Sequence, residues 1–230
     1  MLRSSKNLGA SARKGERTGA IEIDYGEMSK AAQKVVDAFR SCGEGLKKPA
    51  KGPVVSLDVV DPSTGKKRPV DVFAIPSTGT KSAMTGEYSL LRYPDGSQMD
   101  RVVLYPKSEL CMSPDEWKYY ARMVLTHELT HASDPWLHRR PVEGPKRSGG
   151  CAYASFPAEV AAFLSETRED LRSFYGVRKA EKLRKMGKLR QPSDLLRYSH
   201  IYQLFQHCWT PETKRRFMRM AALEWANRGW

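Results

Sequence analysis

The period of the hydrophobic pattern changes twice along the chain. From Met28 to about Arg40 the apolar residues recur at helical spacing, which predicts one amphipathic helix. Residues 54–105 instead contain short runs rich in β-branched residues, separated by clusters of turn-forming residues. After Ser113 the helical spacing returns, and most of the remaining chain is predicted to be helical. The pattern as a whole therefore predicts an α+β fold.

The middle region predicts four strands arranged as two hairpins. Residues 54–60 and 69–75 flank a turn that begins at Asp61-Pro62, and residues 87–93 and 101–105 flank the turn Pro94-Asp95-Gly96. Together they predict a small, mainly antiparallel sheet. The strand Arg101 to Tyr105 is our candidate for its edge, where an extended peptide adds itself as a further strand unless a loop covers it.

The strongest helix signal begins at Ser113. Ser113 is a capping residue, Pro114 occupies a position where its missing N–H group costs nothing, and Glu116 completes a capping box. We expect this helix to end near Ser133. Further helices are predicted at residues 157–175, 193–209 and 212–227.

Inside this helix the segment His127-Glu128-Leu129-Thr130-His131 has the spacing of a zinc site. The two histidines are one helical turn apart, so both imidazoles reach one ion from the same side. Glu128 is placed to act as general base toward a metal-bound water, whose pKa the ion lowers to about 7. The competing interpretation is two core histidines beside a salt-bridged glutamate. The capped helix after a predicted sheet is the context that this motif requires, and it favours the metal site.

A catalytic zinc ion normally takes three protein ligands, so the chain must supply one more. The candidates are Asp134, His138, Glu143, Cys151 and Glu159. The metzincin pattern is excluded, because Asp134 and Leu137 stand where it needs a glycine and a ligand. Glu159 is favoured, since it opens a predicted helix, 28 residues after His131, whose alanines permit close packing. Asp134 is better suited to orient an imidazole than to bind the ion.

Residues 113–171 resemble the core of small gluzincin-type metallopeptidases, in which a glutamate on the next helix joins the histidines of the HExxH motif. The resemblance implies an α+β, zincin-like fold: a small, mainly antiparallel sheet packs on the HExxH helix and on a third-ligand helix, with extra C-terminal helices. It also implies that His127, His131 and Glu159 hold one zinc ion and that Glu128 is the catalytic base. The alternatives to Glu159 are Glu166, Asp134 and His138.

Peptidases of this kind also need a hydrogen-bond donor for the oxyanion of the tetrahedral intermediate. The available candidates are Tyr153, His200 and His207, and we prefer Tyr153 because it lies shortly before Glu159. Residues 134–156 are rich in proline and glycine, and we expect them to form a loop near the cleft.

The chain is strongly basic, and its positive charge is concentrated near its two ends. The chain has 39 Lys and Arg against 26 Asp and Glu, a formal net charge of +13. Residues 171–230 hold 14 basic against 4 acidic residues, and residues 1–20 hold 5 against 1. We expect a basic flexible arm at 1–20, a zincin-like metallopeptidase domain at 21–176, and a basic helical extension packed on it at 177–230. The basic termini are suited to a polyanion such as nucleic acid.

Two functions follow from these patterns. The first is zinc-dependent hydrolysis of peptide bonds in a peptide or protein substrate, with a metal-activated water and Glu128 as general base. The second is a structural or assembly role, for example in a virus particle or other large complex. Such a protein would retain the zincin fold and bind a polyanion or a protein partner through its basic termini.

The cysteines and the apolar runs bear on location. The four cysteines, Cys42, Cys111, Cys151 and Cys208, form no CxxC pair, which favours reduced thiols in a cytoplasm. No apolar run reaches the length of about 18 residues that a membrane span needs. We therefore expect a cytoplasmic protein without a membrane partner, with a virus particle as the alternative location.

Overall fold

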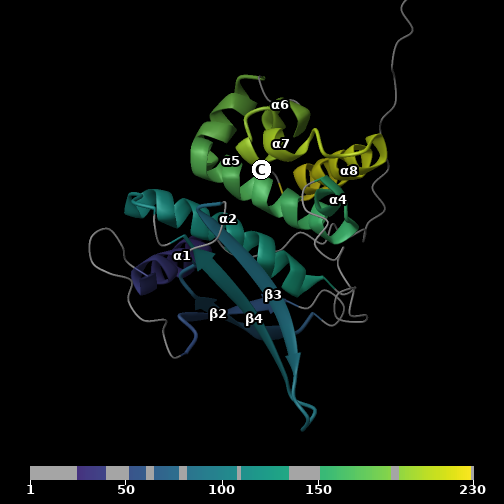
Figure 1. Ribbon diagram of the computed structural model, residues 1–230. Helices are drawn as coiled ribbons and strands as arrows, with labels where there is room; N and C mark the ends of the chain where they lie inside the picture. The colour runs from purple at the N-terminus through teal and green to yellow at the C-terminus, as the bar shows by residue number, and fades with distance from the viewer. Residues whose placement is uncertain are drawn as a thin grey trace, which may run out of the picture.

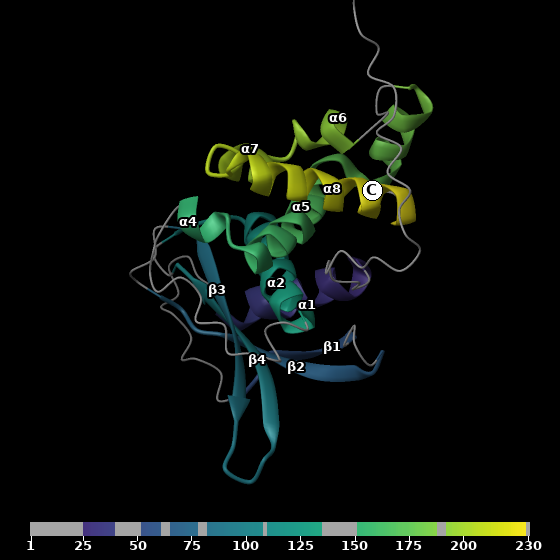
Figure 2. The ribbon, with the colours of Figure 1, turned by 90° about the vertical axis from the view of Figure 1, so that its right-hand side faces the viewer.

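The protein has three layers: a mixed β-sheet, a pair of helices that covers one face of the sheet, and a group of helices beyond that pair (Figures 1 and 2). The computed structural model describes residues 25–39, 52–60, 65–77, 82–107, 110–134, 151–187 and 192–228. The α+β class is confirmed. The arm predicted at residues 1–20 lies outside the described residues.

The sheet contains both predicted hairpins. Its strands are β1 (Val55–Val60), β2 (Lys67–Ala74), β3 (Met84–Arg92) and β4 (Gln98–Pro106). Strands β1 and β2 pair antiparallel, as do β3 and β4, but β2 and β4 pair in parallel and join the hairpins. The sheet is therefore mixed, with two antiparallel strand pairs, as predicted, and one parallel pair. A hairpin pattern fixes the pairing inside each hairpin and leaves open how two hairpins meet.

The edge strands of the sheet are β1 and β3. The strand order is β1-β2-β4-β3, so the prediction that Arg101 to Tyr105 forms the edge is wrong. Those residues belong to β4, which pairs with β2 on one side and with β3 on the other. The central position agrees with the burial of three consecutive residues, Val102, Val103 and Leu104.

The second layer consists of α1 (Tyr25–Phe39) and α2 (Pro114–Ser133). The predicted capping box is present: the Ser113 side chain accepts the N–H of Glu116, and the Glu116 carboxylate accepts the N–H of Ser113. Trp117 of α2 packs edge-on against Phe39 of α1, with 5.0 Å between the ring centroids. These helices and the inner face of the sheet form the first hydrophobic core, which includes Val35, Val70, Leu104 and Leu125.

The third layer is helical. It contains α4 (Cys151–Ala154), α5 (Pro157–Lys185), α6 (Pro192–Leu196), α7 (His200–Phe205) and α8 (Pro211–Arg228). The helix expected at 157–175 thus continues to Lys185. The helix expected at 193–209 is divided at Ser199, which caps α7 and donates to Asp170 of α5 at 2.7 Å. A second core lies among these helices and is rich in aromatic residues, with Phe163, Trp209 and Phe217 at its centre.

Cys151 and Cys208 form a disulfide that joins α4 to the segment after α7. No described cysteine is a free thiol, so the expectation of reduced thiols is wrong for these residues. Sequence spacing gave no sign of this pair because its two members are 57 residues apart. Among the described residues, no helix is both long and apolar enough to cross a membrane.

Candidate metal centre

Helix α2 carries His127, Glu128 and His131 into the space between the two cores. Its C-terminal half packs against the sheet on one side and against α5 on the other, so every residue from Leu125 to Ser133 is buried. These three polar residues are each only 7 % exposed. The rings of His127 and His131 lie one helical turn apart, with 4.9 Å between their centroids. Buried groups of this polarity need partners, because desolvation is costly.

Helix α5 brings Glu159 to both histidines. One carboxylate oxygen, Oε2, lies 3.0 Å from Nε2 of His127, and the other, Oε1, lies 3.4 Å from Nε2 of His131. One ligand atom from each of these residues can be chosen so that all lie within 4.8 Å of one another. Two imidazole nitrogens and one carboxylate oxygen are a donor set that suits zinc. The three residues therefore fit a metal ion, and the favoured third ligand is the one that the structure brings into the group.

Glu166 lies two turns further along α5, behind His127. Its Oε2 is 3.1 Å from Nδ1 of His127, the ring nitrogen opposite the one that faces Glu159. A carboxylate in this position fixes the orientation and tautomer of a ligating imidazole. Sequence reasoning considered Glu166 only as a rival third ligand, because helical spacing places it on the same face as Glu159 without telling which histidine nitrogen it reaches.

The remaining third-ligand candidates lie elsewhere. Asp134 ends α2, where its backbone N–H donates to the carbonyl oxygen of His131 at 3.1 Å, and it is not part of the His-His-Glu group. The sulfur of Cys151 is bonded to Cys208. His138 and Glu143 lie outside the described residues.

His127 and Glu159 shift each other's pKa values toward the charged forms. Burial alone would lower the pKa of His127, but the carboxylates of Glu159 and Glu166 at its two nitrogens raise the pKa well above its usual value. Burial alone would raise the pKa of Glu159, yet its hydrogen bonds to His127 and His131 lower the pKa well below the usual range. Glu159 is therefore a carboxylate at neutral pH, which is the form that binds a cation.

Glu128 lies beside the group and against the edge strand. Burial raises the pKa of its carboxyl group above the usual value, and the backbone N–H of Tyr88 in β3 donates to that carboxylate. At Gly86 the strand passes so close to α2 that a Cβ atom there would lie 2.7 Å from Cγ of Glu128 and 2.5 Å from Cγ1 of Val124. Gly86 and Tyr88 thus fix where the carboxylate of Glu128 sits, and sequence reasoning missed both.

Replacing Gly86 by alanine is expected to displace Glu128 or to push β3 away from α2. The added methyl group has no room, and overpacking of this kind costs about 1–3 kcal/mol of stability. We expect a lower melting temperature by calorimetry. The control is Gly52→Ala, because a Cβ at Gly52 meets no atom within 4 Å. Equal effects of the two substitutions would contradict the positioning role of Gly86.

A partly buried network of polar contacts connects the sheet to the end of α2. Arg68 of β2 pairs with Asp100 of β4 at 2.7 Å and also donates to the carbonyl oxygen of Ala132, the residue after His131. The hydroxyl of Tyr88 donates to the same Asp100 carboxylate. Through this network β2, β3 and β4 all contribute to the position of α2. No spacing rule indicated it, because its members come from four separate elements.

Tyr153 reaches the group from α4. Its hydroxyl is hydrogen-bonded to Glu159, and burial together with that carboxylate raises the pKa of the phenol above its usual value. Tyr153 as a whole remains 38 % exposed, so this residue links the buried Glu159 to the surface. His200 and His207 are exposed on and after α7 and are not part of the His-His-Glu group. The oxyanion role of Tyr153 stays a prediction.

Comparison with protein-family models, with curated proteins and with solved structures finds no match for this chain. No relative therefore supplies a function or a ligand set. What the site does must be inferred from the residues that it brings together, their burial and their charge.

Proposed function

We propose that the protein is a zinc-dependent peptide hydrolase whose metal ligands are His127, His131 and Glu159. The observation that carries this proposal is the convergence of these side chains, from two helices, beside a buried glutamate that is not itself part of the ligand group. A structural zinc site takes four protein ligands, whereas a catalytic site takes three and keeps one position open. Three ligands with an adjacent carboxylate match the second case.

The metal ion and the side chains would each supply part of the catalysis. A zinc ion bound here would act as a Lewis acid and lower the pKa of its water ligand toward about 7. Glu128 would accept a proton during attack on the peptide carbonyl and give it to the leaving amine. Its raised pKa suits both steps, because an acid–base catalyst works best when its pKa approaches the operating pH.

Two further groups support peptide hydrolysis. The phenol of Tyr153 is protonated at neutral pH and would donate to the oxyanion that forms during attack. The edge strand β3 runs past Glu128, and an extended peptide could pair with it as an added strand. The sequence placed the edge strand at β4. The edge strand β3 suits this role instead, because its residues Gly86 and Tyr88 lie against the proposed base, Glu128.

Metal content and peptide cleavage together test the proposal. The protein should be purified without chelator, analysed for zinc by elemental analysis, and incubated with a mixed peptide library that is read by mass spectrometry. We expect one zinc ion per chain, cleavage that stops after chelation, and recovery when zinc is added back. Zinc without cleavage would contradict the hydrolase and leave the ion as a link between α2 and α5. Cleavage that survives chelation would contradict the role of the metal.

A further inference from the structure

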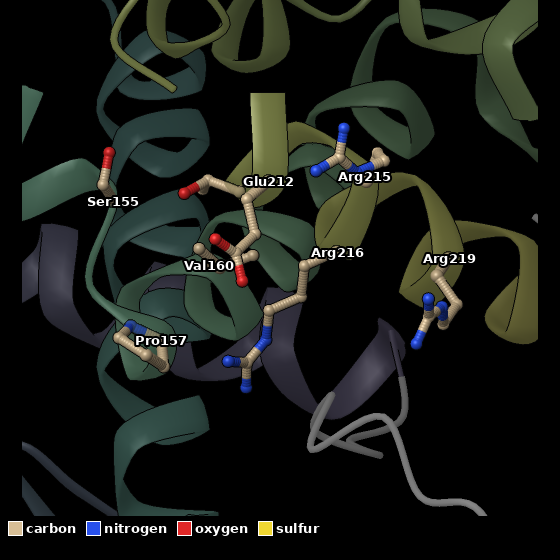
Figure 3. Close-up of a pocket in the computed structure, with 8 residues that line it drawn as sticks. Ser155, Pro157, Val160, Glu212, Arg215, Arg216 and Arg219 are labelled. Carbon is tan, nitrogen blue, oxygen red and sulfur yellow. The ribbon is translucent and has the colours of Figure 1, made fainter. Parts of the chain in front are cut away.

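A pocket separate from the metal group lies between the start of α5 and the first half of α8 (Figure 3). Its volume is about 630 Å³. The lining residues are Ser155, Pro157, Val160, Glu212, Thr213, Arg215, Arg216 and Arg219. Pro157 and Val160 flank Glu159 in sequence, but Glu159 points toward α2, so the pocket and the metal group use different faces of α5.

The lining of this pocket is basic because it contains three arginines. Arg215, Arg216 and Arg219 lie within about one turn of α8, and all three side chains are exposed. None of them forms an ion pair or hydrogen bond in the part of the chain that the structure describes. Figure 3 shows the side chain of Arg216 extending from α8 toward the side of Pro157.

The contrast with the buried arginines is informative. Arg122 and Arg168 are buried and pair with Glu169 and Glu224 respectively, and the half-buried Arg68 pairs with Asp100. Among the described residues, the buried guanidinium groups are thus paired with acids, whereas those of the pocket have no ion-pair partner. Three arginines against one acid, Glu212, give the lining a net charge of +2.

We propose that this pocket binds a phosphate group. The planar guanidinium fork donates two parallel hydrogen bonds to phosphate oxygens, and several arginines together match a group that carries two negative charges. The volume falls in the range of small-molecule pockets, so an organic phosphate such as a nucleotide fits as well as one phosphate of a nucleic acid strand. The two sources share the same chemistry at the arginines.

The alternative interpretation is that these arginines belong to a solvated basic face of α8 and form no specific binding site. A helix face of that kind attracts any anion weakly, and each positive charge on the helix contributes to a similar degree. In a specific binding site, the positive charges that line the site contribute more to anion affinity than the other charges on the helix. Arg216 lines the pocket, whereas Lys214 is exposed on the same helix and does not line it.

Titration of the full-length protein with pyrophosphate by calorimetry tests the proposal, alongside Arg216→Ala and Lys214→Ala. We expect saturable binding that Arg216→Ala weakens about tenfold or more, the effect of a lost hydrogen bond between charged groups. Lys214→Ala should change the affinity less than twofold. Arg216→Lys keeps the charge without the fork and should fall between wild type and Arg216→Ala. Thermal melting confirms that each variant is folded.

A second titration identifies the source of the phosphate. A labelled single-stranded oligonucleotide that binds more tightly than pyrophosphate, with an affinity that falls steeply as salt rises, would assign the pocket to nucleic acid. Binding of the oligonucleotide no tighter than pyrophosphate would assign it to a small organic phosphate. The proposal is overturned by absent binding of both probes, by equal losses in Arg216→Ala and Lys214→Ala, or by an acidic peptide that binds more tightly than either probe.

Discussion

Glu128→Gln is expected to abolish peptide hydrolysis while leaving zinc content and folding close to those of the wild type. The glutamine has the same shape, fits the narrow space beside Gly86, and keeps an oxygen for the backbone N–H of Tyr88. It cannot accept the proton that Glu128 would take from the nucleophile. Loss of a positioned general base typically costs about 10² to 10⁴ in rate, so kcat should fall by at least about 10²-fold.

The measurement compares initial rates, zinc per chain and melting temperature for the two proteins. A matched control is Glu87→Gln, the same chemical change at an exposed position of β3, which should keep both zinc and activity. A Glu128→Gln protein that cleaves peptides at the wild-type rate would remove Glu128 as the base. Loss of zinc together with activity would mean that Glu128 helps to hold the ion, and the base role would have no support.

Glu159→Gln is expected to lose most of the zinc, and Glu166→Gln only part of its affinity. Glu159 lies within reach of Nε2 of both histidines, whereas Glu166 contacts only Nδ1 of His127. An amide is a poor ligand for zinc, so the first substitution removes one of three donors. Loss of a group that merely orients a ligating imidazole typically weakens metal binding about 10- to 100-fold.

Competition with a chromophoric chelator measures both affinities, and thermal melting with and without added zinc provides an independent readout. An ion that binds only the folded state raises stability by RT ln(1 + [L]/Kd), so zinc should raise the melting temperature of the wild type and of Glu166→Gln at sufficient concentration. It should leave Glu159→Gln nearly unchanged. A larger loss in Glu166→Gln than in Glu159→Gln would make Glu166 the third ligand.

Local sequence signals predicted several elements well. The capping box at Ser113 and Glu116 placed the start of α2 at the correct residue, because a helix start depends on neighbouring groups. The hairpins were found for the same reason: each strand pairs with its sequence neighbour across a short turn. Helix boundaries were less accurate where tertiary contacts decide them, as at Ser199, which bonds to Asp170 of α5.

The spacing of residues in the sequence predicted neither the disulfide nor the pocket. Cys151 and Cys208 are brought together by the packing of α4 against the helices of the second core. The arginines of α8 were visible only as part of a basic C-terminal region. Their placement in a pocket with Pro157 and Val160 required the fold.

What the sequence by itself determined about this protein is the α+β class, the two hairpins and the placement of His127, Glu128 and His131 on one helix, because all three depend on periodicity and short-range geometry. Only the tertiary structure decided that β3 rather than β4 lies at an edge of the sheet, that Glu159 rather than Glu166 faces both histidines, and that Gly86 lies against Glu128. These are contacts between elements far apart in the chain, and the packing of whole helices and strands sets them.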